Sequence, residues 1–147
     1  MGLYFEDFEA DRTFVSATRT IEDSEIAAFA ALTGDRHPLH LDDDYARRSP
    51  FGRRIAHGAF VFSVSIGLTT SLDLVTDTLV AFYGVDRMRF RKPVFIGDSV
   101  VLEKRVASTR ATGPNNGLVT FHSNVRNQHG DSVLTYEDTL IVRRRAQ

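Results

Sequence analysis

The spacing of apolar residues divides the chain into a first half of helices and a second half of strands. Residues 14–20 are rich in β-branched side chains and predict a first strand. Apolar residues at helical spacing follow over residues 26–32. They predict an amphipathic helix that begins after an N-cap at Thr20 and ends at Gly34. Residues 42–48 predict a second, short helix.

An uncharged run over residues 58–72 separates the two halves. Within it, residues 59–68 are apolar nearly all round, which is typical of a helix enclosed by other structure. The run is shorter than the ~18–20 apolar residues of a membrane span. Four runs then predict strands, with Gly, Asn and Asp turn signals between them: residues 80–91, 100–107, 118–125 and 133–142.

This order of elements predicts an α+β protein made of a single domain over residues 1–147. The economical packing is one antiparallel sheet wrapped around the long central helix, the hotdog architecture, with the N-terminal helix and the loop after it overhanging one end. A single sheet of this kind has an edge strand, so two copies are expected to pair as a homodimer. The aromatic side chains expected to lie mostly in the core are Phe60, Phe62, Phe82, Tyr83 and Phe90.

Composition narrows the function classes. The chain of 147 residues has 18 basic and 19 acidic side chains and a net charge of -1, which gives no support for binding to nucleic acid or a membrane surface. It has no cysteine, which excludes disulfides, thiolate catalysis and Cys-bound metals. The N-terminus lacks the basic start and apolar core of a secretory signal, so the expected location is the cytoplasm.

The candidate chemistry lies between the two predicted helices and at the start of the apolar run. Asp35 and His40 flank Pro38, which disfavours a helix there and predicts a tight, non-helical segment. Their side chains can therefore converge on one point. His57 and Gly58 stand at the head of the apolar run. Together these residues can hold a water, activate it and stabilise an oxyanion nearby.

Three blocks resemble the MaoC-like hydratases, the family of (R)-specific enoyl-CoA hydratases and 3-hydroxyacyl-thioester dehydratases. The first block is Thr33-Gly34-Asp35-Arg36-His37-Pro38-Leu39-His40. The other two follow in the family's order, as Ile55-Ala56-His57-Gly58 and Pro93-Val94-Phe95-Ile96-Gly97-Asp98. Two departures are His37, where the family usually has Asn, and Ile66, where some relatives carry Ser.

The resemblance implies reversible hydration of a 2-enoyl-CoA or enoyl-acyl-carrier-protein thioester to the (R)-3-hydroxyacyl form. In that reaction Asp35 is expected to be the general base that orients the water, and His40 to hold the same water and help deliver the proton to C2. The backbone N–H of Gly58 is the expected oxyanion donor. No redox cofactor or metal is expected, and coenzyme A is part of the substrate.

Further residues are expected around the bound substrate: His37, Pro38, His57, Ser63, Arg89, Arg91 and Lys92. Among them, the basic side chains suit the phosphates of coenzyme A, and His57 is expected to support the site rather than to catalyse. A metal site built from Asp35, His37, His40 and residues 42–44 is disfavoured, because Pro38 breaks the helical geometry of a His-x-x-His pair.

Two other functions fit the same fold. A hotdog thioesterase would hydrolyse the thioester and release a free thiol, but the segment from Asp35 to His40 resembles the hydratase branch. A non-catalytic acyl-CoA-binding module would bind the thioester without turnover.

Overall fold

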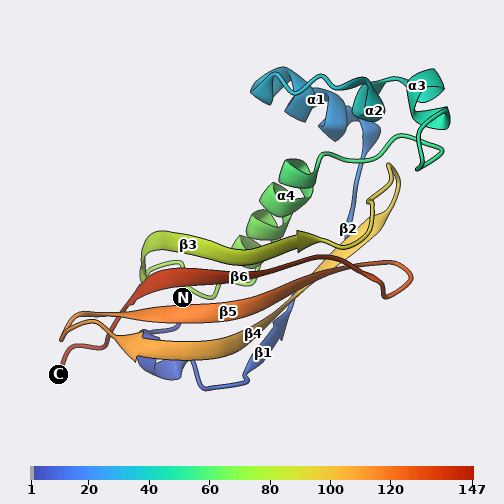
Figure 1. Ribbon diagram of the computed structural model, residues 1–147. Helices are drawn as coiled ribbons and strands as arrows, with labels where there is room; N and C mark the ends of the chain where they lie inside the picture. Colours follow the sequence, from blue (N-terminus) through green and yellow to red (C-terminus); the bar gives the residue numbers. More distant parts are fainter. Residues whose placement is uncertain (1) are drawn as a thin grey trace.

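The computed structural model describes residues 2–147 as one antiparallel sheet wrapped around one long helix (Figure 1). The strands run in the order β1-β4-β5-β6-β3, and β2 also pairs with β4. The α+β hotdog prediction is therefore confirmed. The elements are η1 (Phe5–Asp7), β1 (Thr13–Val15), β2 (Arg19–Thr20), α1 (Asp23–Thr33), α2 (Pro38–Leu41), α3 (Asp43–Arg47), α4 (Gly58–Ser71), β3 (Leu79–Phe90), β4 (Ser99–Ala111), β5 (Asn116–Asn127) and β6 (Ser132–Arg143).

The long elements lie where the sequence predicts them, and the differences are near the N-terminus. The predicted first strand is two short strands with buried Ser16 in the gap between them. The N–H of Ser16 donates to the carbonyl of Leu102, and the hydroxyl of Ser16 accepts the N–H of Leu102, both at 2.9 Å. Thr20 is the last residue of β2 rather than a helix cap. Helix α1 instead begins after Glu22, whose N–H donates to Glu25 Oε1 at 2.9 Å. It ends at Gly34, whose φ of 81° is left-handed as predicted.

The central helix α4 and the sheet bury the main hydrophobic core between them. Helix residues Phe60, Val64 and Leu68 belong to the same buried cluster as residues of strands β4, β5 and β6. A second cluster lies where η1 and the N-terminal segment pack against the sheet, and it contains Phe8 and Phe121. Among residues 2–147, no helix has both the length and the apolar character needed to cross a bilayer.

A buried ion pair ties the middle of the sheet together. Lys104 on β4 and Asp138 on β6 are 0% and 1% exposed, and their Nζ and Oδ2 atoms lie 2.6 Å apart. Ser123 on β5 joins them, since its hydroxyl accepts from Lys104 at 2.8 Å and donates to Asp138 at 2.7 Å. Burial lowers the pKa of Lys104, and the Asp138 carboxylate opposes that shift. Removing one partner of such a pair typically costs ~3–5 kcal/mol, because the other charge is then left buried without compensation.

Strand β3 is an edge strand, because its partner in the sheet is β6 alone. As predicted, Phe60 is buried and Phe62 is half-buried. Phe82, Tyr83 and Phe90 are 45%, 65% and 55% exposed, so the prediction that they fill the core is wrong for the single chain. The β3–β6 register shifts at three points, and the resulting bulges break the strict alternation expected along this strand.

Candidate active site

Helices α1, α2 and α3 form an overhang beyond one end of the sheet, next to the N-terminal end of α4 (Figure 1). Arg54, whose side chain is 16% exposed, clamps this overhang together. Its guanidinium donates to the carboxylate of Asp23 on α1 at 3.0 and 3.1 Å and to Asp43 on α3 at 2.7 Å. It also donates to the carbonyl of His40 at 3.4 Å. No local motif signals this role, because the partners lie 31, 11 and 14 residues away.

The loop from Gly34 to His40 is built by short-range hydrogen bonds. The N–H of His37 donates to Oδ1 of Asp35 at 3.4 Å. The expectation of a wholly non-helical segment is wrong at its end, because Pro38 begins the one-turn helix α2. Proline suits the first helical position, where no N–H is needed. His37 is the N-cap, and its Nδ1 accepts the N–H of Leu39 at 3.1 Å.

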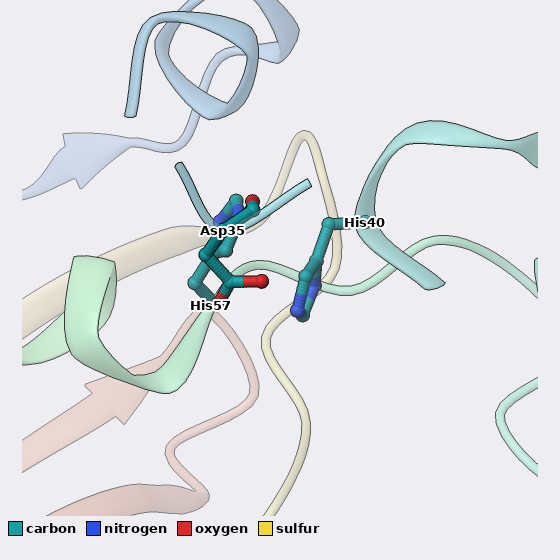
Figure 2. Close-up of side chains that lie close together, drawn as sticks. All are labelled: Asp35, His40 and His57. Carbon is teal, nitrogen blue, oxygen red and sulfur yellow. The ribbon is translucent and has the colours of Figure 1, made fainter. Parts of the chain in front are cut away.

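The predicted pair, Asp35 and His40, meets at one point together with His57. Atoms of all three side chains that could bind a ligand lie within 4.8 Å of one another. Figure 2 shows the carboxylate of Asp35 directed toward the imidazole of His40. A water makes hydrogen bonds of ~2.8 Å, so one molecule can bridge groups at this separation. The geometry is therefore suited to holding a single water between the carboxylate and the imidazole.

The tautomer of His40 is set by its surroundings. Its Nδ1 lies 2.7 Å from the carbonyl oxygen of Ile55, which can only accept, so Nδ1 carries the proton. In neutral His40 this leaves Nε2 as an acceptor. Burial lowers the pKa of His40 and the neighbouring His57 acts in the same direction, while the Ile55 carbonyl and the Asp35 carboxylate oppose the shift. His40 is therefore neutral at neutral pH, with a lone pair on Nε2.

His57 supports both members of the pair. It is 2% exposed, and its ring stacks on that of His40 with centroids 3.9 Å apart. Its Nε2 donates to the backbone carbonyl of Asp35 at 3.0 Å. The rings of His57 and Phe29 also meet edge to face, with their centroids 5.0 Å apart. Within the part of the chain that the structure describes, the buried Nδ1 of His57 has no hydrogen-bond partner.

Asp35, His40 and His57 are residue types that bind metals, but the ring geometry does not favour chelation. A metal ion lies in the plane of each imidazole that binds it, at ~2.0–2.1 Å from the nitrogen for zinc. The rings of His40 and His57 are stacked with an angle of 29° between their planes. Their lone pairs therefore lie in two separate, nearly parallel planes, so an ion close to both rings cannot lie in the plane of each.

Gly58 directly follows His57 and is the first residue of α4. The first N–H groups of an α-helix have no partner within the helix, and the helix dipole favours negative charge at this end. A Cβ at Gly58 would lie 2.9 Å from the ring of Phe90, so a side chain here would have to displace that ring. A cavity of about 380 Å³ adjoins Gly58 and is also lined by Ile55, Val61, Phe90, Arg91 and Lys92.

Only some of the expected substrate-binding residues lie at this cavity. Arg91 and Lys92 line it; the side chain of Arg91 donates to Thr135 Oγ1 at 2.9 Å, and Nζ of Lys92 lies 3.3 Å from Asp131 Oδ2. Arg89 is not among the lining residues, and it donates to the carbonyl of its neighbour Met88 at 2.7 Å.

Pro38 and Ser63 make local contacts within helices α2 and α4. Pro38 is half-buried and begins α2, so its place is structural. Ser63 lies on the exposed side of α4 and donates to the carbonyl of Ala59 at 2.8 Å. It is not among the residues that line the cavity next to Gly58. This position gives no support to a substrate contact through Ser63.

Comparison with known proteins finds relatives that are named as dehydratases and hydratases of acyl-CoA thioesters. The chain is 42% identical over 106 residues to 3-hydroxybutyryl-CoA dehydratase of Methylorubrum extorquens, which covers 71% of this chain and 64% of that protein. The match therefore spans less than two thirds of the relative. The chain is 35% identical over 114 residues to the (R)-specific enoyl-CoA hydratase of Aeromonas caviae, covering 78% of this chain and 81% of that protein.

Comparison with solved structures finds the same kind of protein. The crystal structure of a MaoC-like dehydratase from Rhodospirillum rubrum superposes with a TM-score of 0.90 at 29% identity, covering 99% of this chain and 100% of that chain. The sequence pattern of the MaoC like domain matches residues 7–127, a span that includes Asp35, His40 and Gly58. The chain belongs to the MaoC-like domain family.

Proposed function

We propose that this protein is a hydro-lyase that reversibly adds water to the double bond of a 2-enoyl-CoA thioester, forming the 3-hydroxyacyl thioester. The observation that carries the proposal is the convergence of the Asp35 carboxylate and the His40 imidazole within 4.8 Å, beside the N-terminus of α4. The names of the relatives, a dehydratase and a hydratase of such thioesters, support the same reaction.

The bound water lies between two acceptors at the start of the reaction. One of its hydrogens is directed to the carboxylate of Asp35 and the other to Nε2 of His40, which carries a lone pair because Nδ1 donates to Ile55. Asp35 takes a proton as the water oxygen bonds to C3, and the π electrons move toward the thioester oxygen. The Asp35–His40 pair then returns that proton to C2 on the same face. Dehydration is the same sequence in reverse.

The negative charge that develops on the thioester oxygen needs a donor. We assign the N–H of Gly58, since it is at the positive end of α4 and has no side chain between it and the substrate. The cavity beside Gly58 accommodates the acyl group. Its rim carries Arg91 and Lys92, which we assign to the phosphates of coenzyme A. The reaction changes no oxidation state overall, and we propose that it uses neither a metal nor a redox cofactor.

The product stereochemistry and the location are proposals that the relatives and the sequence support. The A. caviae relative is named as (R)-specific, and we propose the (R)-3-hydroxyacyl product here. Cytoplasmic location stays a prediction from the N-terminal sequence.

We further propose that two copies pair through β3. This strand is 12 residues long, bonds only to β6 within the sheet, and exposes Val80, Phe82 and Tyr83 by 45% or more. An edge strand with exposed apolar side chains is a template for another strand. Antiparallel pairing of β3 with its own copy about a two-fold axis would cover these side chains and close the open edge.

Asp35→Asn should lower kcat by about 10²–10⁴-fold, because the near-isosteric amide cannot accept the proton. The assay is loss of the conjugated enoyl absorbance of crotonyl-CoA, with a parallel measurement of free thiol. The matched control is Asp44→Asn, which changes an exposed acid on α3 and should behave as wild type. Near-normal kcat in Asp35→Asn would remove this carboxylate from the chemistry, and thiol release by wild type would indicate a thioesterase.

Comparing Gly58→Pro with Gly58→Ala separates the effect of losing the backbone N–H from the effect of adding a side chain at this position. Both variants add a Cβ against Phe90, but only proline removes the N–H. Proline is compatible with the first turn of α4, and His57 before it already has φ -58° and ψ 136°. We expect kcat to be about 10²–10³-fold lower in the proline variant than in the alanine variant. Equal kcat in the two folded variants would refute the assigned oxyanion donor.

His37→Asn should keep both stability and kcat, because an Asn side chain can accept the N–H of Leu39 as Nδ1 of His37 does. His37→Ala loses this cap and should lower the free energy of unfolding by about 1 kcal/mol. Urea unfolding and the crotonyl-CoA assay measure the two effects. A collapse of kcat in a folded His37→Asn variant would mean that the imidazole takes part in catalysis.

Tyr83→Lys places a charge in the middle of the exposed edge of β3 and should convert the dimer to a monomer, which sedimentation velocity detects. Leu32→Lys is the control, since Leu32 is 84% exposed but lies on α1. A wild-type protein that sediments as a monomer would contradict the pairing, as would equal dissociation by both variants.

A further inference from the structure

A second, smaller cavity of about 170 Å³ adjoins the cavity next to Gly58. The two cavities share Lys92 and Pro93 among their lining residues, so they meet at this point of the chain. The smaller cavity is lined mainly by polar side chains, among them Arg53 and Asp98. It therefore offers polar contacts to the part of a substrate that extends beyond the larger cavity.

The guanidinium of Arg53 is held over the ring of Phe95, with Cζ 3.8 Å from the ring centroid. Backbone contacts fix the two segments to each other. Ile55 forms an antiparallel bridge with Phe95, and the N–H of Ala56 donates to the carbonyl of Val94 at 2.7 Å. The guanidinium is therefore positioned at the cavity by the aromatic ring and by the chain on either side of it.

The two acidic side chains that line the smaller cavity already have partners. Asp98 is 6% exposed, and its Oδ2 accepts the N–H of Phe95 at 2.9 Å. Its Oδ1 accepts from Nε2 of Gln128 at 2.8 Å. Oδ2 of Asp131 lies 3.3 Å from Nζ of Lys92. Neither carboxylate is paired with the guanidinium of Arg53.

The N–H groups of Arg53 are free to bind a ligand. Within residues 2–147 its guanidinium makes no hydrogen bond or ion pair, and the residue is exposed. A planar guanidinium that stacks on an aromatic ring keeps its N–H edge available. That edge matches two oxygens of one phosphate group. Lys92 supplies a second positive charge where the two cavities meet.

The separation of Arg53 from Gly58 fits the arm of a carrier thioester. The two residues are five positions apart, so their Cα atoms lie at most ~18 Å apart. About fourteen bonds lead from a thioester carbon through pantetheine to the first phosphorus. Three backbone bonds span ~3.3–3.6 Å, so an arm of that length reaches roughly 15–17 Å. A phosphate at the end of the arm can therefore meet Arg53 while the thioester lies beside Gly58.

We infer that Arg53, held by Phe95, binds the phosphate that ends the pantetheine arm of the substrate. This inference rests on the proposed function, since it takes the thioester to lie beside Gly58. The same phosphate is present in coenzyme A and in the phosphopantetheine arm of an acyl-carrier protein. Arg53 therefore recognises the chemistry that the two carriers share.

The test removes the phosphate from the substrate and the guanidinium from the protein, separately and together. The substrates are crotonyl-4′-phosphopantetheine and crotonyl-pantetheine, which differ only in that phosphate. Wild type should have a kcat/KM about 10–100-fold higher for the phosphorylated substrate, because charge-assisted hydrogen bonds are made only to it. In Arg53→Met this preference should fall about tenfold, since the fork of N–H donors is lost while Lys92 remains.

Phe95→Leu should lower the preference in the same direction, because it removes the ring that positions the guanidinium. The control is Arg110→Met, which changes an exposed arginine near the far end of β4 and should keep the wild-type preference. A folded Arg53→Met variant with the wild-type preference would overturn the inference, as would a wild type that does not distinguish the two substrates. An unchanged preference in Phe95→Leu would refute the part assigned to the ring.

Two larger substrates identify the source of the phosphate. Crotonyl-CoA and a crotonyl thioester of an acyl-carrier protein are compared in wild type and in Arg53→Met. The carrier that wild type hydrates with the higher kcat/KM is the source, and its kcat/KM should fall about tenfold in the variant. No fall with either carrier would overturn the inference.

Failure of the proposed function gives a different result. Calorimetry with butyryl-4′-phosphopantetheine and butyryl-pantetheine measures the same preference without turnover. Tighter binding of the phosphorylated compound that is lost in Arg53→Met, without hydration of any crotonyl thioester, would support the phosphate site and refute the hydratase. Hydration of both small substrates with equal kcat/KM would support the hydratase and refute the phosphate site.

Discussion

The hydrogen bond from Nδ1 of His40 to the carbonyl of Ile55 is the interaction on which the proposed site depends. At 2.7 Å it joins the loop after α1 to the segment that leads into α4. It thereby brings the group that holds the water to the helix end that stabilises the oxyanion. It also fixes the tautomer, so that Nε2 of neutral His40 accepts a hydrogen from water. The bond therefore joins the segment that carries the acid–base pair to the segment that carries the oxyanion donor.

Other contacts make this arrangement stiff. His57 stacks on His40 and donates to the carbonyl of Asp35, so one buried ring holds both members of the pair. Arg54 ties the overhanging helices to each other and to the carbonyl of His40. The buried contact between Lys104 on β4 and Asp138 on β6 links strands of the sheet on which α4 packs. The contacts of His57 and Arg54 therefore hold the loop against the segment that leads into α4.

The central helix, the end of α1 and the Asp35–His40 pair could be predicted from the sequence, because each depends on residues that are close together in the chain. The apolar run after His57 predicted the central helix, and Gly34 predicted the left-handed end of α1. Spacing around a proline predicted that Asp35 and His40 converge. The clamp by Arg54 was not predictable, since it joins residues that are distant in the sequence. Nor were the bulges in β3 and the exposure of Phe82, because these depend on which strand ends at the edge of the sheet.

In the proposed reaction Asp35 and His40 share one water and act on one face of the double bond. The most direct test is to hydrate crotonyl-CoA in heavy water and to analyse the 3-hydroxybutyryl-CoA by NMR at early times. We expect a single deuterium at C2, on the same face as the new hydroxyl at C3, with no free coenzyme A. Deuterium on the opposite face would contradict a water held by the two residues together, and release of coenzyme A without hydration would contradict the hydratase itself.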